Sequence, residues 1–524
     1  MMFKLRLLFA VMNVIYLPLE WIVLLIYKKP RCSLTPITKS LFTLSATTIA
    51  KKIREKEITS YEVVNEYIER IKEVNSSLNA VVDNRFENAI IEAKKCDEQL
   101  RSGKLDLEKL KKEKPLYGVP CTMKESIGVK GCSHTGCTLS RKGVKATDDA
   151  VVVKLLRDAG AILLCITNTP EMCICFETTN LVYGHTKNPY DARYSAGGSS
   201  GGEGALLGAG ASLIGFGSDL GGSIRVPALY NGVFGHKPTS GIVSNTGHYP
   251  LSDDKCFQSL LCLGPLARYA EDLSLVMRVI TSQCGCNLRL DVPVDVNELK
   301  VYYLQSLDRS LGVLPVTAEI KNCVQQAANH FMKYGVSVEK LPIKLPAEIC
   351  EIALTKIISM ENPVSLLNAD NTKKDPLYEL GKGLLGLSEN MKETCIMMLA
   401  FKHNLFFSKS DISKYAKQGE SIRQKLVNLL GENGVFIYPT FHRSAVLPKF
   451  SICEIMNHVY TYLFNTFGFP ATHVPMGLNR DGLPIGVQVI AAPYQDRLCL
   501  AVAKELETAF GGWIPPSPLA IKNN

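Results

Sequence analysis

Residues 197–225 read GGSSGGEGALLGAGASLIGFGSDLGGSIR, and the rest of the chain is interpreted from this stretch outward. Two clusters rich in glycine and serine, residues 197–202 and 221–223, flank a run of small apolar residues. Glycine lets the backbone approach another backbone or a ligand closely. The N–H groups of such turns can form a concavity for a negative charge. A serine at the edge of that concavity is therefore a candidate nucleophile.

Three other interpretations of this stretch are a flexible linker, a phosphate-binding loop and a nucleophile elbow. A flexible linker would not enclose the apolar segments 205–207 and 212–216. Neither phosphate-binding pattern, G-x-G-x-x-G or G-x-x-x-x-G-K-[ST], occurs in it. Residues 197–201 do match G-x-S-x-G, the nucleophile elbow of α/β-hydrolases, but that elbow needs a buried strand before it. Residues 192–196 make a poor strand, so the elbow remains the weaker alternative.

The stretch, together with GVPCTMKE at residues 118–125 and VPALYNGVFGHKPTSG at 226–241, resembles the amidase signature family. These serine hydrolases use a Ser-Ser-Lys triad. The resemblance implies that Ser223 is the nucleophile, that Ser199 follows a cis peptide bond and relays protons, and that Lys124 is the base. By itself, Lys124 would be read as a surface lysine at the end of a strand.

The resemblance implies further site residues around the triad. The backbone N–H groups expected to hold the oxyanion are those of Leu220, Gly221, Gly222 and Ser223. Ser200 would support the network by hydrogen bonding. Cys173 belongs to the segment 169–177, which lines the acyl side of the pocket in the family, although core packing explains its apolar character equally well. Asp219 and Arg225 would pair and shape the loop, with an ordinary surface ion pair as the alternative.

The implied chemistry requires a neutral lysine. An unperturbed lysine has a pKa of ~10.4, and burial lowers it by disfavouring the charged form. Lys124 would then take a proton from Ser199, which takes one from Ser223 as Ser223 forms an acyl-enzyme. The proton returns through Ser199 to the leaving nitrogen, and water completes hydrolysis. None of the nine histidines is needed for this scheme.

Composition adds limits to this interpretation. The 524 residues are 46% hydrophobic, and the net charge of +9 is scattered without a basic–aromatic pattern, so no nucleic-acid partner is expected. The 17 cysteines are an odd number and many lie in apolar runs, which indicates buried thiols. Cys132 with Cys137 and Cys284 with Cys286 have no second pair at metal-binding spacing, so neither a metal nor a cofactor is expected.

The N-terminus contains a second informative stretch, LLFAVMNVIYLPLEWIVLLIY at residues 7–27. It is long enough to cross a bilayer, although Asn13, Pro18 and Glu20 weaken it. A signal peptide is the alternative, but no small-x-small cleavage site follows. We expect an uncleaved single-pass anchor in the endoplasmic reticulum or another internal membrane. The flanking charges leave its orientation open, and Asn75 begins a glycosylation sequon that is usable only on the luminal side.

Length alone suggests about three domains, but the resemblance runs from about residue 45 to 510 as one unit. We therefore predict an anchor at 1–30, a linker at 31–44 and a catalytic domain at 45–515, within which 346–418 is variable. The fold class is α/β, the amidase signature fold: one large twisted mixed β-sheet surrounded by α-helices, with an N-terminal transmembrane helix. Periodicity predicts helices at 45–54, from 59, 87–100, 148–158, 271–281, after 317 and 497–510, and strands at 161–166, 299–304, 336–341 and 434–439.

The residues GGEG at 201–204, the run 231–238 and the N-terminal anchor most resemble family members that hydrolyse fatty acid amides. The resemblance thus implies a lipid amide substrate and a membrane as partners, and it allows a homodimer. The alternatives are a hydrolase of soluble amides, the amidase subunit of a tRNA-dependent amidotransferase, and a lipid-binding protein on an inactive scaffold. Residues 377–401 are predicted to form a membrane-touching cap and part of an acyl channel, or else a core helix.

Overall fold

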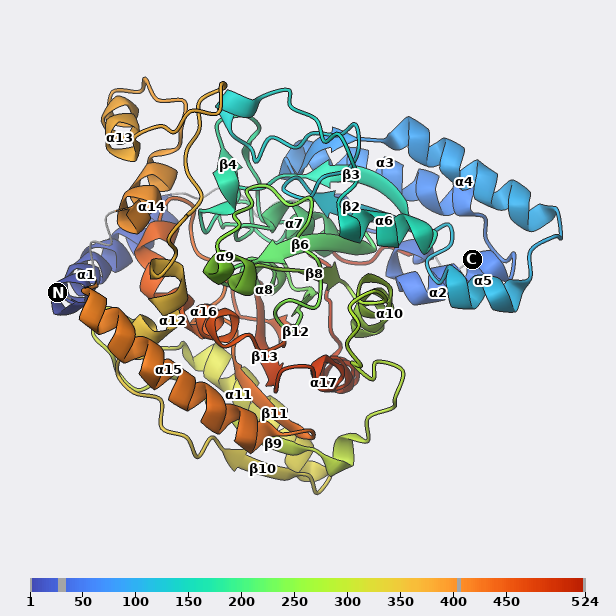
Figure 1. Cartoon of the computed structure of the whole chain (residues 1–524). Coiled ribbons are helices and arrows are strands. Elements are labelled where there is room, and N and C mark those ends of the chain that lie inside the picture. Colours follow the sequence, from blue (N-terminus) through green and yellow to red (C-terminus); the bar gives the residue numbers. More distant parts are fainter. Residues whose placement is uncertain (1, 27–33, 403–406, 522–524) are drawn as a thin grey trace.

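The computed structural model describes residues 2–26, 34–402 and 407–521. Residues 1 and 27–30 of the predicted anchor and residues 31–33 of the predicted linker lie outside the described residues. The described chain contains one large mixed sheet with helices around it (Figure 1). This arrangement confirms the predicted fold class.

The large sheet has 11 strands in the order β1-β3-β2-β6-β8-β7-β12-β13-β11-β9-β10. Strand β2 is parallel to β3 and β6, and β9 is parallel to β10 and β11, while the remaining neighbours are antiparallel. A separate two-stranded sheet pairs β4 (Thr179–Asn180) with β5 (Gly184–His185). The strands of the large sheet are β1 (Val81–Asn84), β2 (Pro120–Lys124), β3 (Ile162–Thr167), β6 (Ile214–Asp219), β7 (Phe234–Lys237), β8 (Cys262–Ala267), β9 (Lys300–Tyr303), β10 (Ser337–Lys340), β11 (Gly434–Pro439), β12 (Ala471–Leu478) and β13 (Pro484–Ala491).

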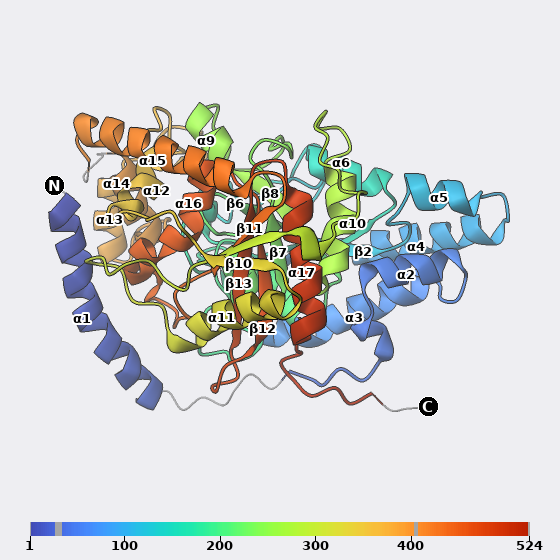
Figure 2. The same ribbon diagram turned by 90° about the horizontal axis from the view of Figure 1, so that it is seen from below.

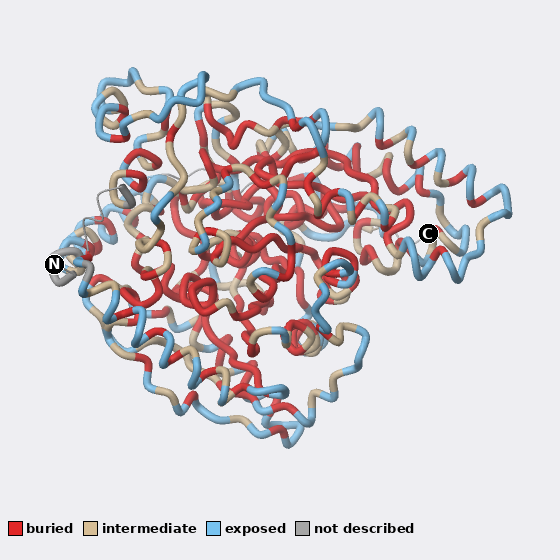
Figure 3. Tube along the Cα trace, viewed as in Figure 1, coloured by how far each residue is buried: buried red, intermediate tan, exposed pale blue. Residues whose placement is uncertain are grey.

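Helices cover both faces of this sheet, as the alternation of side chains along β11 shows. Val435 and Ile437 join an apolar cluster with α10, α11 and α17, whereas Phe436 and Tyr438 join another with α12, α15 and α16. Figure 3 shows the buried sheet inside a more exposed shell of helices. The helices are α1 (Met2–Ile26), α2 (Ala46–Arg54), α3 (Ser60–Leu78), α4 (Phe86–Arg101), α5 (Leu107–Glu113), α6 (Val151–Asp158), α7 (Gly201–Gly208), α8 (Arg225–Tyr230), α9 (Lys255–Leu260), α10 (Ala270–Ile280), α11 (Ala318–Lys333), α12 (Ile349–Ile358), α13 (Pro376–Leu384), α14 (Lys392–Lys402), α15 (Lys409–Leu430), α16 (Val459–Phe467) and α17 (Asp496–Phe510), with short 3₁₀ turns at Ser40–Thr43, Leu139–Arg141, Glu171–Cys173, Val296–Glu298 and Ser451–His458.

Most of the predicted elements lie within a residue or two of their predicted bounds. The capping box of α3 is present, with Thr59 and Glu62 each satisfying a backbone N–H of the other. The helix predicted from residue 148 instead begins at Val151. The residues before it are held in the loop, because Asp149 Oδ1 accepts a hydrogen bond from Lys130 N at 2.8 Å and Ala150 N donates to Gly128 O at 2.8 Å.

The topology brings two chain segments to one edge of the sheet. Strands β2 and β6 are parallel neighbours, with Thr122 opposite Gly215 and Met123 opposite Phe216. The carboxyl ends of parallel neighbours lie at the same edge, so Lys124 at the end of β2 comes beside Ser218 and Asp219 at the end of β6. The loop that ends at Ser200, just before α7, lies at this edge as well, because Ser199 contacts Lys124.

Helices α1, α13 and α14 lie on one flank of the molecule, away from α4 and α5 (Figures 1 and 2). In the described part of the chain, α1 is the one helix long and apolar enough to cross a membrane, judged by length and composition. The segment 377–401 divides into two kinds of surface. Leu384 at the end of α13 and Leu385 just after it are about three-quarters exposed, at 73% and 75%, whereas Met397 and Met398 of α14 are buried. The core-helix alternative therefore fits α14 and does not fit α13.

Candidate active site

Lys124 is completely buried at the end of β2. Its Nζ lies 2.6 Å from Ser199 Oγ and 2.9 Å from Ser218 Oγ. Burial lowers the pKa of Lys124, and the nearby Cys173 thiol and Asp219 carboxylate oppose this only in part. Such an environment favours the neutral amine, which can accept a proton from a hydroxyl.

Ser199 is held by the first glycine cluster. The Gly198–Ser199 peptide bond is cis, and Ser199 O accepts a hydrogen bond from Thr169 Oγ1 at 2.9 Å. A side chain at Gly198 would meet backbone atoms of residues 175–177 within 2.7 Å, so the backbone fits here only as glycine. Ser200 N donates to Ser223 O at 3.2 Å, which ties this cluster to the second one.

Ser223 lies in the loop between β6 and α8, at the surface of a cavity. The loop is shaped by Asp219, whose carboxylate accepts from Gly222 N at 2.6 Å and Ile224 N at 3.1 Å. Gly222 has a φ of 125°, which a side chain would oppose. Within the described chain, the N–H groups of Leu220, Gly221 and Ser223 and the Ser223 hydroxyl have no hydrogen-bond partner. Those three amides remain available to an oxyanion, whereas the Gly222 amide is engaged.

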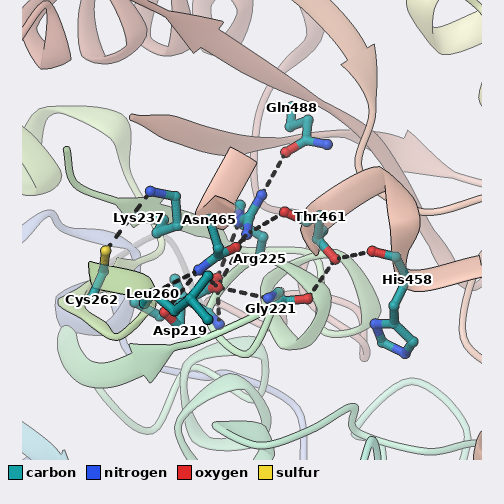
Figure 4. Close-up of polar contacts among 12 residues, drawn as sticks. Asp219, Gly221, Arg225, Lys237, Leu260, Cys262, His458, Thr461, Asn465 and Gln488 are labelled. Carbon is teal, nitrogen blue, oxygen red and sulfur yellow. Dashed lines mark hydrogen bonds and ion pairs between the residues drawn. The ribbon is translucent and has the colours of Figure 1, made fainter. Parts of the chain in front are cut away.

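Asp219 and Arg225 form a completely buried ion pair (Figure 4). Arg225 Nε and Nη2 lie 3.1 Å from the two carboxylate oxygens. Asn465 Nδ2 donates to Asp219 Oδ1 at 3.0 Å, and Arg225 Nη1 donates to Gln488 Oε1 at 3.0 Å. Burial raises the pKa of Asp219, but Arg225 and the Gly222 N–H outweigh it and hold that pKa well below the usual range. The surface-pair alternative for these two residues is therefore wrong.

The cavity and the open space at its mouth together enclose about 790 Å³. Ser199, Ser218 and Ser223 lie at one part of its wall, and Cys173 lines it beside Thr169, whose Oγ1 is 3.3 Å from the Cys173 Sγ. Most of the remaining wall is apolar. Its apolar side chains are those of Met172, Ile174, Phe176, Leu220, Pro250, Phe257, Leu261, Ile357, Met360, Pro363, Val364 and Met397. The last five come from the region predicted to be variable.

Two residues of the site were missed by sequence reasoning, Ser218 and His248. Ser218 Oγ lies 2.9 Å from His248 Nε2, and His248 Nδ1 lies 2.8 Å from the carbonyl oxygen of Pro250. A carbonyl only accepts, so Nδ1 carries the proton and Nε2 accepts one from Ser218. Burial and the neighbouring Lys124 lower the pKa of His248 to about 3, which keeps the ring neutral.

This hydrogen-bond order also orients the lysine. Because the Ser218 hydroxyl hydrogen points to His248, Ser218 Oγ must accept an N–H from Lys124. When the lysine is neutral, its lone pair is then left for Ser199. Ser218 lies inside the stretch from which the sequence was interpreted, one residue before Asp219, whereas His248 lies in a loop that carried no motif.

The cysteines in the described part of the chain are free thiols, as predicted. No group of three or more His, Cys, Asp or Glu side chains in the described ranges could hold a metal ion.

Comparison with known proteins places the chain among amidases. The family model of the amidases matches residues 62–500. Fatty-acid amide hydrolase 2 of Homo sapiens is 38% identical over 93% of this chain and 92% of its own length, and fatty-acid amide hydrolase 2-A of Danio rerio is 40% identical over 93% of each. The solved structure of a fatty acid amide hydrolase superposes with a TM-score of 0.70 at 22% identity, covering 91% of this chain and 87% of that one.

Proposed function

The chain belongs to the amidase signature family and is a serine amidase, and on this premise we propose that it hydrolyses fatty acid amides to a free fatty acid and an amine at Ser223. The observation that carries the proposal is the buried Lys124, 2.6 Å from Ser199, beside an apolar cavity that also exposes Ser223. A buried neutral base next to a hydroxyl relay is what acylation of a serine requires.

The proposed reaction proceeds through an acyl-enzyme. Ser223 Oγ bonds to the amide carbonyl carbon as its proton passes to Ser199 Oγ, while the Ser199 proton passes to Lys124 Nζ. Collapse of the tetrahedral intermediate breaks the carbon–nitrogen bond, and the proton returns from Lys124 through Ser199 to the leaving nitrogen. Water then attacks the ester by the same relay and releases the acid. The amides of Leu220, Gly221 and Ser223 would hold the oxyanion, and each such donor is typically worth about 10²–10³ in rate.

Two observations support a fatty acyl substrate. The cavity wall beyond Ser223 is mainly apolar, which suits an acyl chain and offers little to the charged ends of free glutamine. The curated relatives named above are fatty-acid amide hydrolases, and the chain covers nearly their whole length. Met397 of α14 and Ile357 of α12 line the same cavity, so the region predicted to be variable contributes to the acyl site.

Membrane association is part of the proposal, because the substrate would reside in lipid. The residues Arg6–Ile26 of α1 have a mean hydropathy of 2.1, and α13 exposes several leucines. Both helices lie on the same flank as α14, which lines the cavity (Figure 2). The compartment and the homodimer remain predictions from the sequence.

The test is a substrate panel with a matched activity probe. The detergent-solubilised protein is incubated with primary amides of increasing acyl length, and free fatty acid is measured. We expect a preference for long chains, and a fluorophosphonate adduct on Ser223 that the Ser223→Ala variant lacks. An adduct on Ser199 would instead favour the nucleophile elbow.

The other outcomes separate the alternatives. Ammonia released from free glutamine, with no long-chain activity, would indicate an amidotransferase-type enzyme. A correctly folded protein that cleaves no amide would indicate a lipid-binding protein on an inactive scaffold.

A further inference from the structure

The polar side chains of α1 that the structure describes all lie on one face, which packs against the catalytic domain. Arg6, Asn13 and Glu20 recur at seven-residue intervals, and Phe9 and Tyr16 fall between them on the same stripe. The side chains of Phe9, Asn13, Tyr16 and Glu20 are buried. This 3–4 spacing is that of a helix packed on a neighbour along its length.

Ion pairs connect both ends of this stripe to the catalytic domain. Near the N-terminal end, Arg6 Nε and Nη2 lie 2.6 and 2.5 Å from the carboxylate of Glu351 in α12. Towards the other end, Glu20 lies 2.8 and 2.9 Å from the guanidinium of Arg443. Arg443 also lies 3.0 Å from Glu454, a completely buried carboxylate. The two contacts are 14 residues apart, which is roughly 21 Å of helix.

Hydrogen bonds connect the middle of the stripe. Asn13 Nδ2 donates to Gly312 O at 3.3 Å, and the Tyr16 hydroxyl donates to Glu454. Each partner is at least 299 residues away in the sequence. The contacts therefore run along most of the described helix and are not confined to one end.

The opposite face of α1 is exposed and apolar. From Leu7 onward, its exposed large side chains are Leu7, Leu8, Val11, Val14, Ile15, Leu17, Leu19, Trp21, Ile22, Val23, Leu25 and Ile26. A helix on a water-facing surface turns its polar side outward, whereas α1 turns its polar side inward. From Leu7 to Ile26 the described side chains of this face are apolar and uncharged, a surface that suits lipid.

We infer that α1 lies in the plane of one membrane surface, with its apolar face embedded in a single leaflet and its polar face holding the catalytic domain, and that it does not cross the bilayer. This inference rests on the proposed membrane association and changes the single-pass arrangement expected from the sequence. It names a lipid bilayer as the partner of this face. Exposed Leu377, Leu384, Leu385 and Leu387 of the α13 region lie on the same flank and extend the surface.

The charges explain why the in-plane arrangement is favoured. If α1 crossed the bilayer with its contacts intact, the domain residues Glu351, Arg443 and Glu454 would enter a hydrocarbon core about 30 Å thick. If α1 left the domain to cross alone, Glu20 would enter the membrane unpaired, and Arg443 would lose one carboxylate partner. Separating buried partners in this way is strongly unfavourable. Lying flat keeps every pair together.

The decisive experiment compares the sides on which the two termini lie. The full-length chain, with one epitope tag before Met1 and another after Asn524, is inserted into sealed vesicles and treated with protease. In-plane binding leaves both tags on the same side, so both are digested or both are protected. Protection of one tag and digestion of the other would overturn the inference. This result does not depend on amide hydrolysis, so it is separate from failure of the proposed reaction.

Matched variants of the two faces give a second test. Val14→Asp with Ile22→Asp, on the exposed face, should release the chain from phosphatidylcholine vesicles without changing the melting temperature in detergent. Glu20→Arg, on the docked face, should lower that melting temperature because it places a second cation beside Arg443, and Glu20→Gln, which adds no cation, should lower it less. If the Val14 and Ile22 changes lower the melting temperature and leave vesicle binding intact, protein covers that face, such as a second copy of the chain, and the inference is wrong.

Discussion

At the residue scale, the burial of Lys124 makes a prediction about pH. Burial lowers the pKa of this lysine from its usual ~10.4, so the neutral base is populated above the lowered pKa and is lost as the pH falls through it. We therefore expect kcat/KM to fall towards acid pH. Lys124→Ala should reduce the rate by about 10²–10⁴ while the circular dichroism spectrum is retained.

The control for this prediction is Lys51→Ala, since the Lys51 side chain is exposed on α2. Its pH profile should match that of the unchanged protein. A Lys124→Ala enzyme with a near-normal rate at pH 7 would show that another group is the base.

His248 and Ser218 are predicted to act as positioning residues for that lysine. Ser218 accepts an N–H from Lys124, which favours the protonated form, so Ser218→Ala should lower the pKa of Lys124 further. The acid limb of the rate profile should then move to lower pH, and kcat should fall by roughly tenfold, the equivalent of about one hydrogen bond.

The identity of the acceptor distinguishes positioning from packing. His248→Gln keeps an acceptor for Ser218 and should retain more activity than His248→Phe, which does not. If the acid limb stays in place in Ser218→Ala, or if both His248 variants behave alike, the proton order derived from the Pro250 carbonyl is not used in catalysis.

At the scale of the element, α13 and α14 have different surfaces and should respond differently to mutation. Leu384 and Leu385 of the α13 end are largely exposed, so changing both to Ser should leave the melting temperature nearly unchanged. On the cap hypothesis, it should raise KM for long-chain amides presented in vesicles and leave short soluble amides unaffected, because Ser223 is untouched. The measurement is steady-state kinetics with both substrates.

The matched control changes Ile91 and Leu107 to Ser. These residues are also exposed, but they lie on α4 and α5 at the far end of the molecule. The control should leave both KM values unchanged. Equal losses on long and short amides in the Leu384/Leu385 variant would contradict a cap role for α13.

At the scale of the whole molecule, the Asp219–Arg225 pair joins the active-site loop to distant segments. Arg225 Nη2 donates to Asn465 and to Thr461 O, and Arg225 Nη1 donates to Gln488 of β13. Arg225→Leu would leave the Asp219 carboxylate buried without its cation, and breaking such a pair typically costs about 3–5 kcal/mol. Chemical denaturation at pH 7 should show this loss, and labelling of Ser223 should fall with it.

The effect of Arg225→Leu on stability should depend on pH, in a direction that follows from the pKa of Asp219. Its pKa in the folded state lies below the usual value, so the stability it contributes is complete above the unfolded pKa of ~3.9 and is lost as the pH falls towards the folded value. The difference in the free energy of unfolding between Arg225→Leu and the unchanged protein should therefore become smaller as the pH falls below the unfolded pKa. As a control, breaking the exposed pair Lys51–Glu55 should lower the free energy of unfolding by only about 0–1 kcal/mol. A similarly small loss for Arg225→Leu would contradict the role of the Asp219–Arg225 pair in stabilising the active-site loop.

Features that depend on neighbours along the chain could be predicted from the amino-acid sequence. The capping box of Thr59 and Glu62, the helical periodicity of α3 and α17 and the buried strand β11 are local patterns, and each lies close to its predicted position. The family could also be identified from the motifs around Lys124, Ser199 and Ser223, because the chemistry restricts which residues fit those positions. The two glycine clusters could be predicted to hold the active site, because the close backbone contacts found there exclude side chains.

Contacts between groups far apart in the sequence became visible only in the folded chain. His248 reaches Ser218 from another loop, and the Gly222 amide turns to Asp219 instead of the cavity. From the sequence, the apolar run 7–27 is predicted to be a membrane-spanning helix, and Asn13 and Glu20 only weaken that prediction. In the fold they are contacts to Gly312 and Arg443, residues 299 and 423 positions away. Hydropathy averages a helix over all its faces, whereas its environment depends on which face the folded domain covers.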